Sequence, residues 1–169
     1  QASLHVVHIN HGVRGKASDG DSLFVKKQAH ELKIPHSERK LTNMTGVASE
    51  NLMRQKRYEV LCQIKKQLKA PFIVTAHHRD DLLETRIMRL LQGTGIHGLQ
   101  AMTLFNDEGV MRPFLCVTRR EIEIYAKRKN IRWKDDATNK DTTKLRNWII
   151  RNWLALLDRA HPQYVDNLF

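Results

Sequence analysis

Short β-rich segments alternate with longer helical segments along this chain, and this order constrains the fold more than any other feature. Strands are expected over residues 4–9, 36–41 and 72–76, and helices over residues 18–32, 47–68 and 80–92. The run from Phe72 to Ala76 is densely apolar, as strands buried inside a parallel sheet are. Repetition of strand, helix and strand predicts the α/β class, a parallel sheet with helices on both faces.

The segments beyond residue 92 are mainly helical. In order, the pattern predicts a flexible loop at Gly93, Gly95 and Gly98, an extended segment over 111–115, a helix over 118–129, a polar loop over 135–141 and a helix over 145–159. Thr118 followed three residues later by Glu121 is a capping-box pattern, which fixes the expected start of the fourth helix.

The charge of the chain limits its class of partner. Lys and Arg total 29 against 18 for Asp and Glu, a formal net charge of +11. A domain this basic usually binds a polyanion, so we favour a nucleic acid over an ordinary basic surface.

The two cysteines, Cys62 and Cys116, form no CxxC motif, which argues against a zinc or iron–sulfur site and fits the cytoplasm. No membrane-length apolar run or signal peptide pattern is found, so no membrane partner is expected.

Reactive side chains concentrate between Thr75 and Thr85, at the expected carboxyl end of a strand, where α/β sheets bind their ligands. On a helix that begins near Asp80, Asp81 and Glu84 lie three residues apart and share a face. Leucine and isoleucine residues occupy the roughly opposite face, so both carboxylates are expected to look into a cleft. One is a candidate Mg²⁺ ligand together with substrate phosphates. The other is a candidate for binding an amine or positioning a nucleophile.

The same segment allows other interpretations. Acidic residues in the first turn complement any helix dipole, and Asp80 alone can serve as an N-cap. His77 and His78 are candidates for contacting a phosphate or a developing anion. The alternative is that both are loop residues with satisfied hydrogen bonds and no role in binding. Together with Asp80 and Asp81 they suggest a metal-dependent hydrolase. We rank this interpretation lower, because adjacent histidines need not converge on one metal.

Five short motifs follow one another along the chain. They are His8-Ile9-Asn10-His11-Gly12-Val13-Arg14; Glu50, Arg54, Arg57 and Tyr58; residues 75–85 with Gln92-Gly93-Thr94-Gly95; residues 111–115; and Asp136-Ala137-Thr138-Asn139 with residues 146–151. In this order they resemble the motifs HxxHGLR, ExxxRxxRY, TAHHxDDxxET…GxG, RPLL and D-x-S/T-N…RNxIR. These motifs are those of the tRNA(Ile)-lysidine synthetase family, within the N-type ATP pyrophosphatases of the PP-loop superfamily. The similarity covers nearly the whole chain, which argues against a chance match.

The resemblance implies a fold, a reaction and its cofactors. The fold is a Rossmann-like sheet of the adenine nucleotide alpha hydrolase type. The reaction is the ATP-dependent ligation of L-lysine to the wobble cytidine of tRNA(Ile) with a CAU anticodon. ATP adenylates the ring carbonyl with release of pyrophosphate, and the lysine amino group then displaces AMP to give lysidine. ATP and Mg²⁺ are the expected cofactors, and a homodimer is an open option because family members are often dimers.

The resemblance also assigns roles to residues. Asp81 is expected to help hold Mg²⁺, and Glu84 to face the lysine substrate. Arg54 and Arg57, on one helix face, are expected to contact ATP, tRNA phosphate or the reacting base, with a solvated basic face as the alternative. The remaining candidates for binding ATP or substrate are His11, Arg14, His77, His78, Thr85, Gly93, Gly95, Arg146 and Asn147.

One departure from the family pattern concerns the SGGxDS phosphate loop, which should precede the strand at Leu4. We therefore expect a fragment that lacks the first strand and is inactive or nearly so by itself. Residues 1–115 are expected to form the nucleotide-binding domain, and residues 116–169 a helical extension toward C-terminal tRNA-binding domains. Two alternatives stay open. One is another ATP-dependent tRNA base modifier such as a thiolase, and the other is a catalytically inert RNA-binding fragment.

Overall fold

The computed structural model describes residues 3–10, 16–41, 50–134 and 145–164. The chain divides into two compact units, Gln1–Ile73 and Val74–Phe169, and each is described by itself. Among the described residues, no helix is long and apolar enough to cross a membrane. The division into domains at residue 115 that the sequence suggests stays a prediction.

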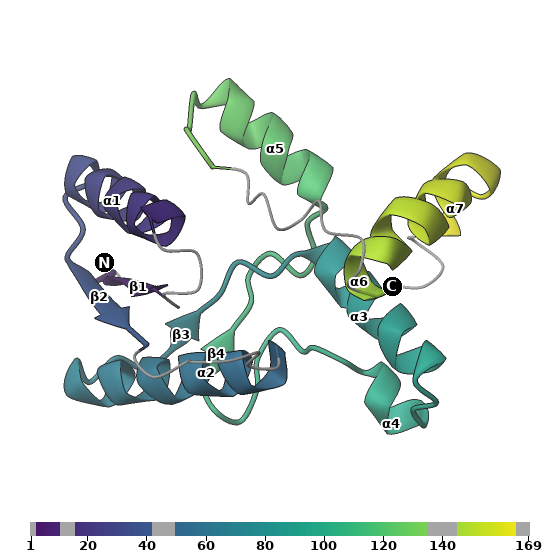
Figure 1. Cartoon of the computed structure of the whole chain (residues 1–169), viewed down its shortest axis with the longest axis horizontal. Coiled ribbons are helices and arrows are strands. Elements are labelled where there is room, and N and C mark those ends of the chain that lie inside the picture. Colours follow the sequence, from purple (N-terminus) through teal and green to yellow (C-terminus); the bar gives the residue numbers. More distant parts are fainter. Residues whose placement is uncertain (1–2, 11–15, 42–49, 135–144, 165–169) are drawn as a thin grey trace. The chain divides into compact units, whose positions relative to one another are not determined.

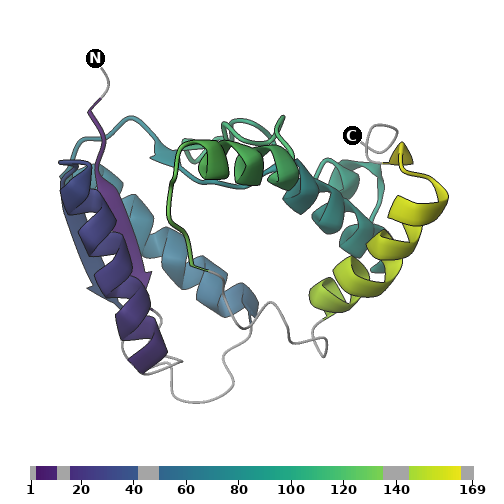
Figure 2. The ribbon, with the colours of Figure 1, turned by 90° about the horizontal axis from the view of Figure 1, so that it is seen from above.

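The first unit is built on a β–α–β arrangement. It contains β1 (Val6–Asn10), α1 (Lys16–Glu31), β2 (His36–Lys40) and α2 (Glu50–Gln67). β1 and β2 are parallel, in a register that pairs Val6 with His36 and Asn10 with Lys40. Helix α1 lies alongside this strand pair (Figures 1 and 2). A helix between two parallel strands is the arrangement that the alternating sequence pattern predicts, so the α/β class is confirmed.

The turn between α1 and β2 shows how local sequence sets this arrangement. Lys33 takes a left-handed conformation, with φ of 55°, just after the helix. The N–H of Lys33 donates to His30 O at 3.0 Å, and the N–H of Ile34 donates to Ala29 O at 2.9 Å. These bonds occupy the last carbonyls of the helix, as in a Schellman motif. Pro35 then excludes further helix and directs the chain into β2.

The second unit is mainly helical. Its elements are β3 (Ile73–Val74, which begins at the unit boundary), α3 (Arg79–Leu91), α4 (Ile96–Leu99), β4 (Val110–Met111), α5 (Arg119–Arg128), α6 (Leu145–Trp148), the π-helix η2 (Ile149–Leu154) and α7 (Ala155–Ala160). β3 and β4 form a two-stranded sheet, which the N–H of Thr75 extends by donating to Met111 O at 3.0 Å. Helix α3 and the C-terminal helical segments share the buried core cluster of this unit.

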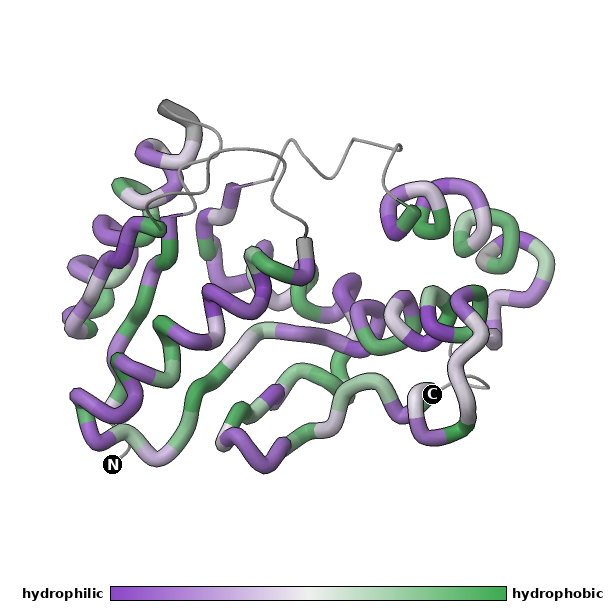
Figure 3. Tube along the Cα trace, turned by 60° about the horizontal axis from the view of Figure 1, so that its bottom comes forward, coloured by the Kyte–Doolittle hydropathy of each residue, from purple (hydrophilic) through white to green (hydrophobic). Residues whose placement is uncertain are grey.

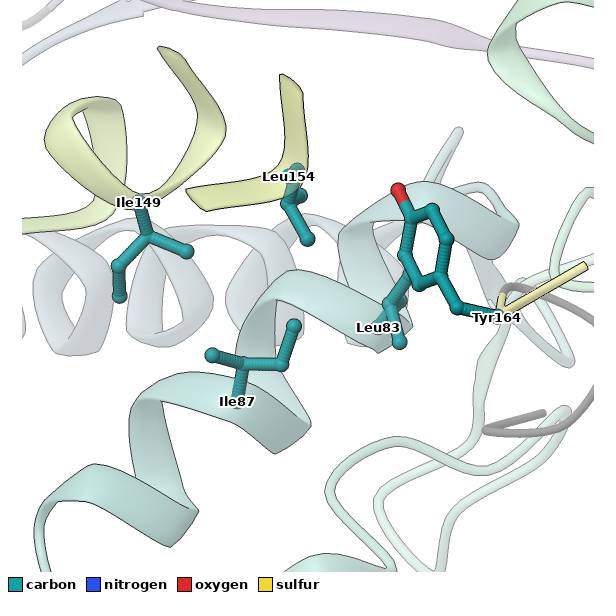
Figure 4. Close-up of a cluster of buried hydrophobic side chains, with 5 residues drawn as sticks. All are labelled: Leu83, Ile87, Ile149, Leu154 and Tyr164. Carbon is teal, nitrogen blue, oxygen red and sulfur yellow. The ribbon is translucent and has the colours of Figure 1, made fainter. Parts of the chain in front are cut away.

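The core of the second unit is a cluster of five buried side chains, Leu83, Ile87, Ile149, Leu154 and Tyr164 (Figure 4). Leu83 and Ile87 are four residues apart on one face of α3, where they meet Ile149 and Leu154 of η2. A π-helix bonds residues five apart, and this places Ile149 and Leu154 on the same side of their helix. Burying each aliphatic side chain is worth about 1.5–3 kcal/mol, so this cluster fixes the C-terminal helices on α3.

Most segments predicted from the sequence are confirmed. Strands 4–9 and 36–41 and helices 18–32, 47–68, 80–92 and 118–129 correspond to β1, β2, α1, α2, α3 and α5, with small shifts at their ends; residues 47–49 lie outside the described residues. The helix expected over 145–159 is continuous in extent but contains the π-helical segment. Figure 3 shows hydrophilic and hydrophobic stretches alternating along the helices, which is the pattern that made them recognisable. The polar loop expected over 135–141 lies outside the described residues.

Two predictions are wrong in detail. The strand expected over 72–76 is only Ile73–Val74, and Phe72 and Val74 are 47% and 54% exposed. The apolar run predicts a fully buried strand, but the burial of a strand depends on the strands beside it. Among the described residues, β3 pairs with β4 alone. The segment after Gly93 is not simply a flexible loop, because Gly98 lies within α4 and its N–H donates to Gly95 O at 2.9 Å.

Candidate functional site

The acid-and-histidine segment lies where the sequence places it, between the end of β3 and the first turns of α3. His78 is the N-cap of α3, with an extended backbone. Its Nδ1 accepts from the N–H of Asp81 at 3.3 Å, while Asp81 Oδ2 accepts from the N–H of His78 at 3.0 Å. This reciprocal capping box holds the Asp81 carboxylate at the start of the helix.

His78, not Asp80, is the N-cap of α3, so the alternative that Asp80 serves only as an N-cap is wrong. Its Oδ2 instead accepts from the N–H of Arg119, at the start of α5, at 2.8 Å. The N–H of Arg79 donates to Val117 O at 3.0 Å beside it. Asp80 therefore ties the beginning of α3 to the beginning of α5, where a carboxylate also complements the helix dipole.

The two neighbouring carboxylates alter the acidity of His78. Its Nδ1 lies 3.5 Å from Asp80 Oδ2, and its Nε2 lies 3.4 Å from Asp81 Oδ2. The hydrogen bond to Asp80 raises the pKa of His78, with Asp81 adding to this and burial opposing it. The same bond lowers the pKa of Asp80. When the ring is doubly protonated its Nδ1 donates toward Asp80, and the cap that it makes to Asp81 is then lost.

Asp81 and Glu84 share a face of α3, as their spacing predicts, and a single arginine binds both. Arg146 Nε donates to Glu84 Oε2 at 2.8 Å, and its Nη2 lies 2.7 Å from the same oxygen. Its Nη2 also donates to Asp81 Oδ1 at 2.7 Å. Arg146 comes from α6, which packs on α3 in the same unit. We call these three residues the carboxylate–arginine cluster.

Burial sets the chemistry of this cluster. The side chain of Glu84 is only 10% exposed, against 35% for Arg146. Desolvation raises the pKa of Glu84, the nearby Asp81 adds to the rise, and the Arg146 guanidinium opposes it. A buried carboxyl with a raised pKa is a better proton acceptor than an exposed one, so Glu84 is suited to act on a substrate ammonium.

Three further candidates belong to the second unit. Thr75 Oγ1 and His77 Nδ1 are 2.8 Å apart. Thr85 Oγ1 donates to Asp81 O at 2.7 Å, so its hydroxyl supports the helix backbone. Asn147 follows Arg146 on α6 and is half-buried. Of these three residues, only Thr85 has a described contact with a residue of the cluster, and the roles of all three in binding stay predictions.

The glycine candidates differ in what they require. Gly93 has a φ of 77°, a conformation that disfavours any side chain, whereas a Cβ on Gly95 would meet nothing within 4 Å. The sequence did not single out Gly98 as a site residue, yet a Cβ there would collide with Thr94. Arg89 Nη1 donates to Gly98 O at 2.6 Å, which fixes this turn against α3.

The remaining candidates belong to the first unit. Arg54 and Arg57 are exposed on α2 in the first unit, with the Arg54 guanidinium 5.9 Å from the ring centre of Tyr58. His11 and Arg14 lie outside the described residues. Their predicted contacts with ATP or RNA stay predictions.

Two arginines of α3 were missed by sequence reasoning. Arg86 Nε donates to Leu99 O at 3.1 Å, and Arg89 holds Gly98 as described. Their spacing of three residues on one helix was the available signal. Beside them an open, mainly apolar pocket of about 570 Å³ is lined by Leu83, Arg86, Ile87, Leu90, Ile96, His97, Leu99 and Gln100.

The donor set at the cluster bears on the expected metal. Within the described ranges, no three His, Cys, Asp or Glu side chains are grouped to hold a metal ion. Mg²⁺ differs, since it is often bound through one or two carboxylates with phosphates and water completing its shell. Asp81 is a donor of this type, but its Oδ1 accepts from Arg146 and its Oδ2 from the N–H of His78, so its metal role stays a prediction.

Comparison with known proteins gives consistent matches. A family model described as a PP-loop domain matches residues 1–157. The tRNA(Ile)-lysidine synthase of Porphyromonas gingivalis strain W83 is 33% identical over 95% of this chain and 37% of its own length. That of Petrotoga mobilis is 36% identical over 98% of this chain and 54% of its own length. That of Bdellovibrio bacteriovorus is 43% identical over 66% of this chain and 35% of its own length. The chain therefore spans roughly a third to a half of these relatives.

A solved structure shares the fold. The U34-tRNA thiolase NcsA from Methanococcus maripaludis, determined with its 4Fe-4S cluster, matches with a TM-score of 0.75 and 16% identity. The match covers 98% of this chain and 59% of the thiolase chain. At this identity the comparison supports the fold alone.

Proposed function

Because this chain belongs to the PP-loop domain family, we propose that it serves an ATP-dependent tRNA modification, the ligation of L-lysine to the wobble cytidine of tRNA(Ile). The observation that carries the proposal is the carboxylate–arginine cluster on α3 and α6, together with curated relatives that are named tRNA(Ile)-lysidine synthases. The net charge of +11 supports an RNA substrate.

The proposed reaction has two steps. The ring carbonyl oxygen of the cytidine attacks the α-phosphorus of ATP, so that an oxygen–phosphorus bond forms and pyrophosphate leaves. The lysine amine then attacks the activated ring carbon, loses a proton, and expels AMP with the original oxygen. Mg²⁺ bound with ATP would offset charge on the phosphates, and Asp81 is the residue proposed to hold it.

Glu84 is proposed to bind and deprotonate the lysine ammonium. Arg146 engages Oε2 of Glu84, and Oε1 is the oxygen proposed to meet the amine. A lysine ammonium must lose a proton before it can attack, and the raised pKa of Glu84 makes its carboxylate a stronger base. Arg146 holds this carboxylate in place and balances its charge next to Asp81.

A thiolase is the second candidate, and its support is weaker. The NcsA likeness extends to the fold alone. Cys62 is half-buried on α2, whereas Cys116 is exposed and its thiol donates to Pro113 O at 3.7 Å. The two cysteines belong to different units of the chain, and neither lies in the carboxylate–arginine cluster.

The proposal is tested with labelled lysine, Mg-ATP and a tRNA(Ile) transcript. The assay is run on the 169-residue chain and on the longest natural chain that contains it. Label in the tRNA that requires ATP and the wobble cytidine supports lysidine formation. AMP release without lysine incorporation would indicate another nucleophile, and no signal in either chain would reject the proposal.

Two variants separate the proposed roles. Glu84→Gln should impair lysine incorporation more than formation of the adenylated tRNA, because only the second step uses the amine. Asp81→Asn should weaken the Mg²⁺-dependent first step. Equal loss of both steps in Glu84→Gln, or full activity of Asp81→Asn, would contradict the assigned roles.

A further inference from the structure

The end of α5 carries a dense group of positive charges. Residues 127–134 include Lys127, Arg128, Lys129, Arg132 and Lys134 and no acidic residue, and every side chain in this stretch is exposed. Trp133, within the same stretch, is 48% exposed. We call residues 127–134 the basic segment.

The basic segment begins with a hydrogen-bonded turn at the end of α5. Asn130 takes a φ of 51° directly after the helix. The N–H of Asn130 donates to Lys127 O at 3.2 Å, and the N–H of Ile131 donates to Ala126 O at 2.9 Å. These two bonds make a Schellman turn, which ends α5 and separates Lys127, Arg128 and Lys129 from the cations that follow by only a short turn in the sequence.

Helix stabilisation explains only part of this charge. Cations in the last turn complement the helix dipole, which accounts for Lys127 and Arg128. Arg132 comes after the turn, where the dipole effect has largely decayed. Within the part of the chain that the structure describes, Arg128, Lys129 and Arg132 form no ion pair. By contrast, Arg119 at the other end of α5 pairs with Glu123 at 2.9 Å.

We propose that the basic segment is an RNA-contact surface, on which the cations bind phosphates and the Trp133 ring stacks on a base. An exposed aromatic ring beside the exposed cations Arg128, Lys129 and Arg132 is the combination that binds single-stranded nucleic acid, because stacking tolerates any base and the cations follow the backbone. The choice of RNA as the ligand rests on the proposed function. The base that stacks on Trp133 is expected to come from a loop of the tRNA substrate.

The test uses charge-matched variants of the whole chain. Arg128→Gln/Lys129→Gln/Arg132→Gln removes three charges from the basic segment. Lys26→Gln/Lys27→Gln/Lys66→Gln removes three exposed charges from α1 and α2. Binding of fluorescent tRNA(Ile) transcript is measured by anisotropy over a range of KCl concentrations, and circular dichroism checks that each variant is folded.

Losing three phosphate contacts should reduce the slope of log K against log salt by about 2–3, and weaken binding on the order of 10²-fold at about 0.1 M salt. Trp133→Ala should weaken binding by about 5- to 100-fold with little change of slope, and Trp133→Phe should retain most of the affinity. The charge-matched control should keep the slope of the unaltered protein.

Failure of this inference is distinguishable from failure of the proposed function. Equal slopes for both triple variants, or no effect of Trp133→Ala, would overturn the RNA-contact surface whatever the catalytic result. Stronger binding of the unaltered protein to phosphatidylserine vesicles than to tRNA, lost in the first variant, would overturn it in favour of a lipid surface. Binding that depends on the basic segment, in a protein that incorporates no lysine, would support the surface and reject only the reaction.

Discussion

Removing the arginine of the carboxylate–arginine cluster should destabilise the second unit in a pH-dependent way. Arg146→Met keeps most of the side-chain bulk but removes the guanidinium. Glu84, with a side chain 10% exposed, then loses its two contacts at 2.7–2.8 Å, and Asp81 loses one at 2.7 Å. The buried carboxylate is left without a compensating charge.

The size of the effect follows from burial. Breaking a fully buried ion pair by removing one partner costs about 3–5 kcal/mol. The guanidinium is 35% exposed, so water can replace part of what it supplies. We therefore expect Arg146→Met to lower the free energy of unfolding by about 2–3 kcal/mol at about pH 8.

The sign of the pH dependence follows from the pKa of Glu84. Burial already raises the pKa of Glu84 above the ordinary value of a glutamate, and loss of the Arg146 guanidinium should raise it further. A group whose pKa is higher in the folded state than in the unfolded state stabilises fully below the unfolded value, and this stability is lost as pH rises through the folded value. The penalty of Arg146→Met should therefore be small near pH 4 and grow toward its full size by about pH 8.

The assay is urea unfolding followed by tryptophan fluorescence. All three tryptophans, Trp133, Trp148 and Trp153, belong to the second unit, so the signal reports on that unit. Arg151→Met, an exposed arginine of the same helical stretch, is the matched control and should cost less than about 0.5 kcal/mol.

A double variant identifies the source of the penalty. In Glu84→Gln/Arg146→Met no carboxylate remains to be buried at position 84, so the loss should be smaller than that of Arg146→Met alone at pH 8. An equal penalty at pH 4 and pH 8, or a double variant that loses the sum of the two single effects, would refute the reasoning.

Three further predictions concern packing and turns, each measured by urea unfolding with the same tryptophan signal. Ile149→Ala, at a side chain with 0% exposure, should lower the free energy of unfolding by about 2–5 kcal/mol. Leu156→Ala, 60% exposed in the adjoining helix, should lower it by less than about 0.5 kcal/mol. Similar losses for both variants would contradict the placement of the core. Gly98→Ala should destabilise the protein by about 1–3 kcal/mol, because its Cβ would collide with the threonine four residues earlier. Gly95→Ala should be tolerated, because its Cβ would meet nothing within 4 Å. A larger loss for Gly95→Ala than for Gly98→Ala would show that the turn is built differently. Thr118→Ala removes the N-cap of α5 and should cost about 1 kcal/mol, and an unchanged midpoint would mean that the cap adds nothing to the stability of this unit.

Local patterns in the sequence were sufficient wherever neighbouring residues decide the structure. The Thr118–Glu121 capping box is confirmed, with the Thr118 N–H donating to Glu121 Oε2 at 2.8 Å. The shared face of Asp81 and Glu84 follows in the same way from the helical repeat. Both depend on contacts three residues apart, which any helix at that position brings together.

Other features could not be predicted from local sequence rules, because those rules favoured a different structure from the one that the folded chain adopts. Histidine is not a favoured N-cap, so sequence preference indicated Asp80, yet His78 caps α3 and Asp80 binds the start of α5. The apolar run at Phe72 predicted a buried strand, but its exposure is set by which strands lie beside it. Neither result can be read from the residues within one turn or strand.

The sequence by itself determined the α/β alternation, the acidic segment at a strand end and the positive charge, because these depend on composition and short-range periodicity. The tertiary structure alone decided that Arg146 pairs with Glu84, which lies 62 residues earlier in the chain. That contact exists because the buried cluster around Ile149 fixes the C-terminal helices on α3. The acidity of Glu84 is set by the same packing, since desolvation and the charge of Arg146 are properties of the surroundings and not of the residue.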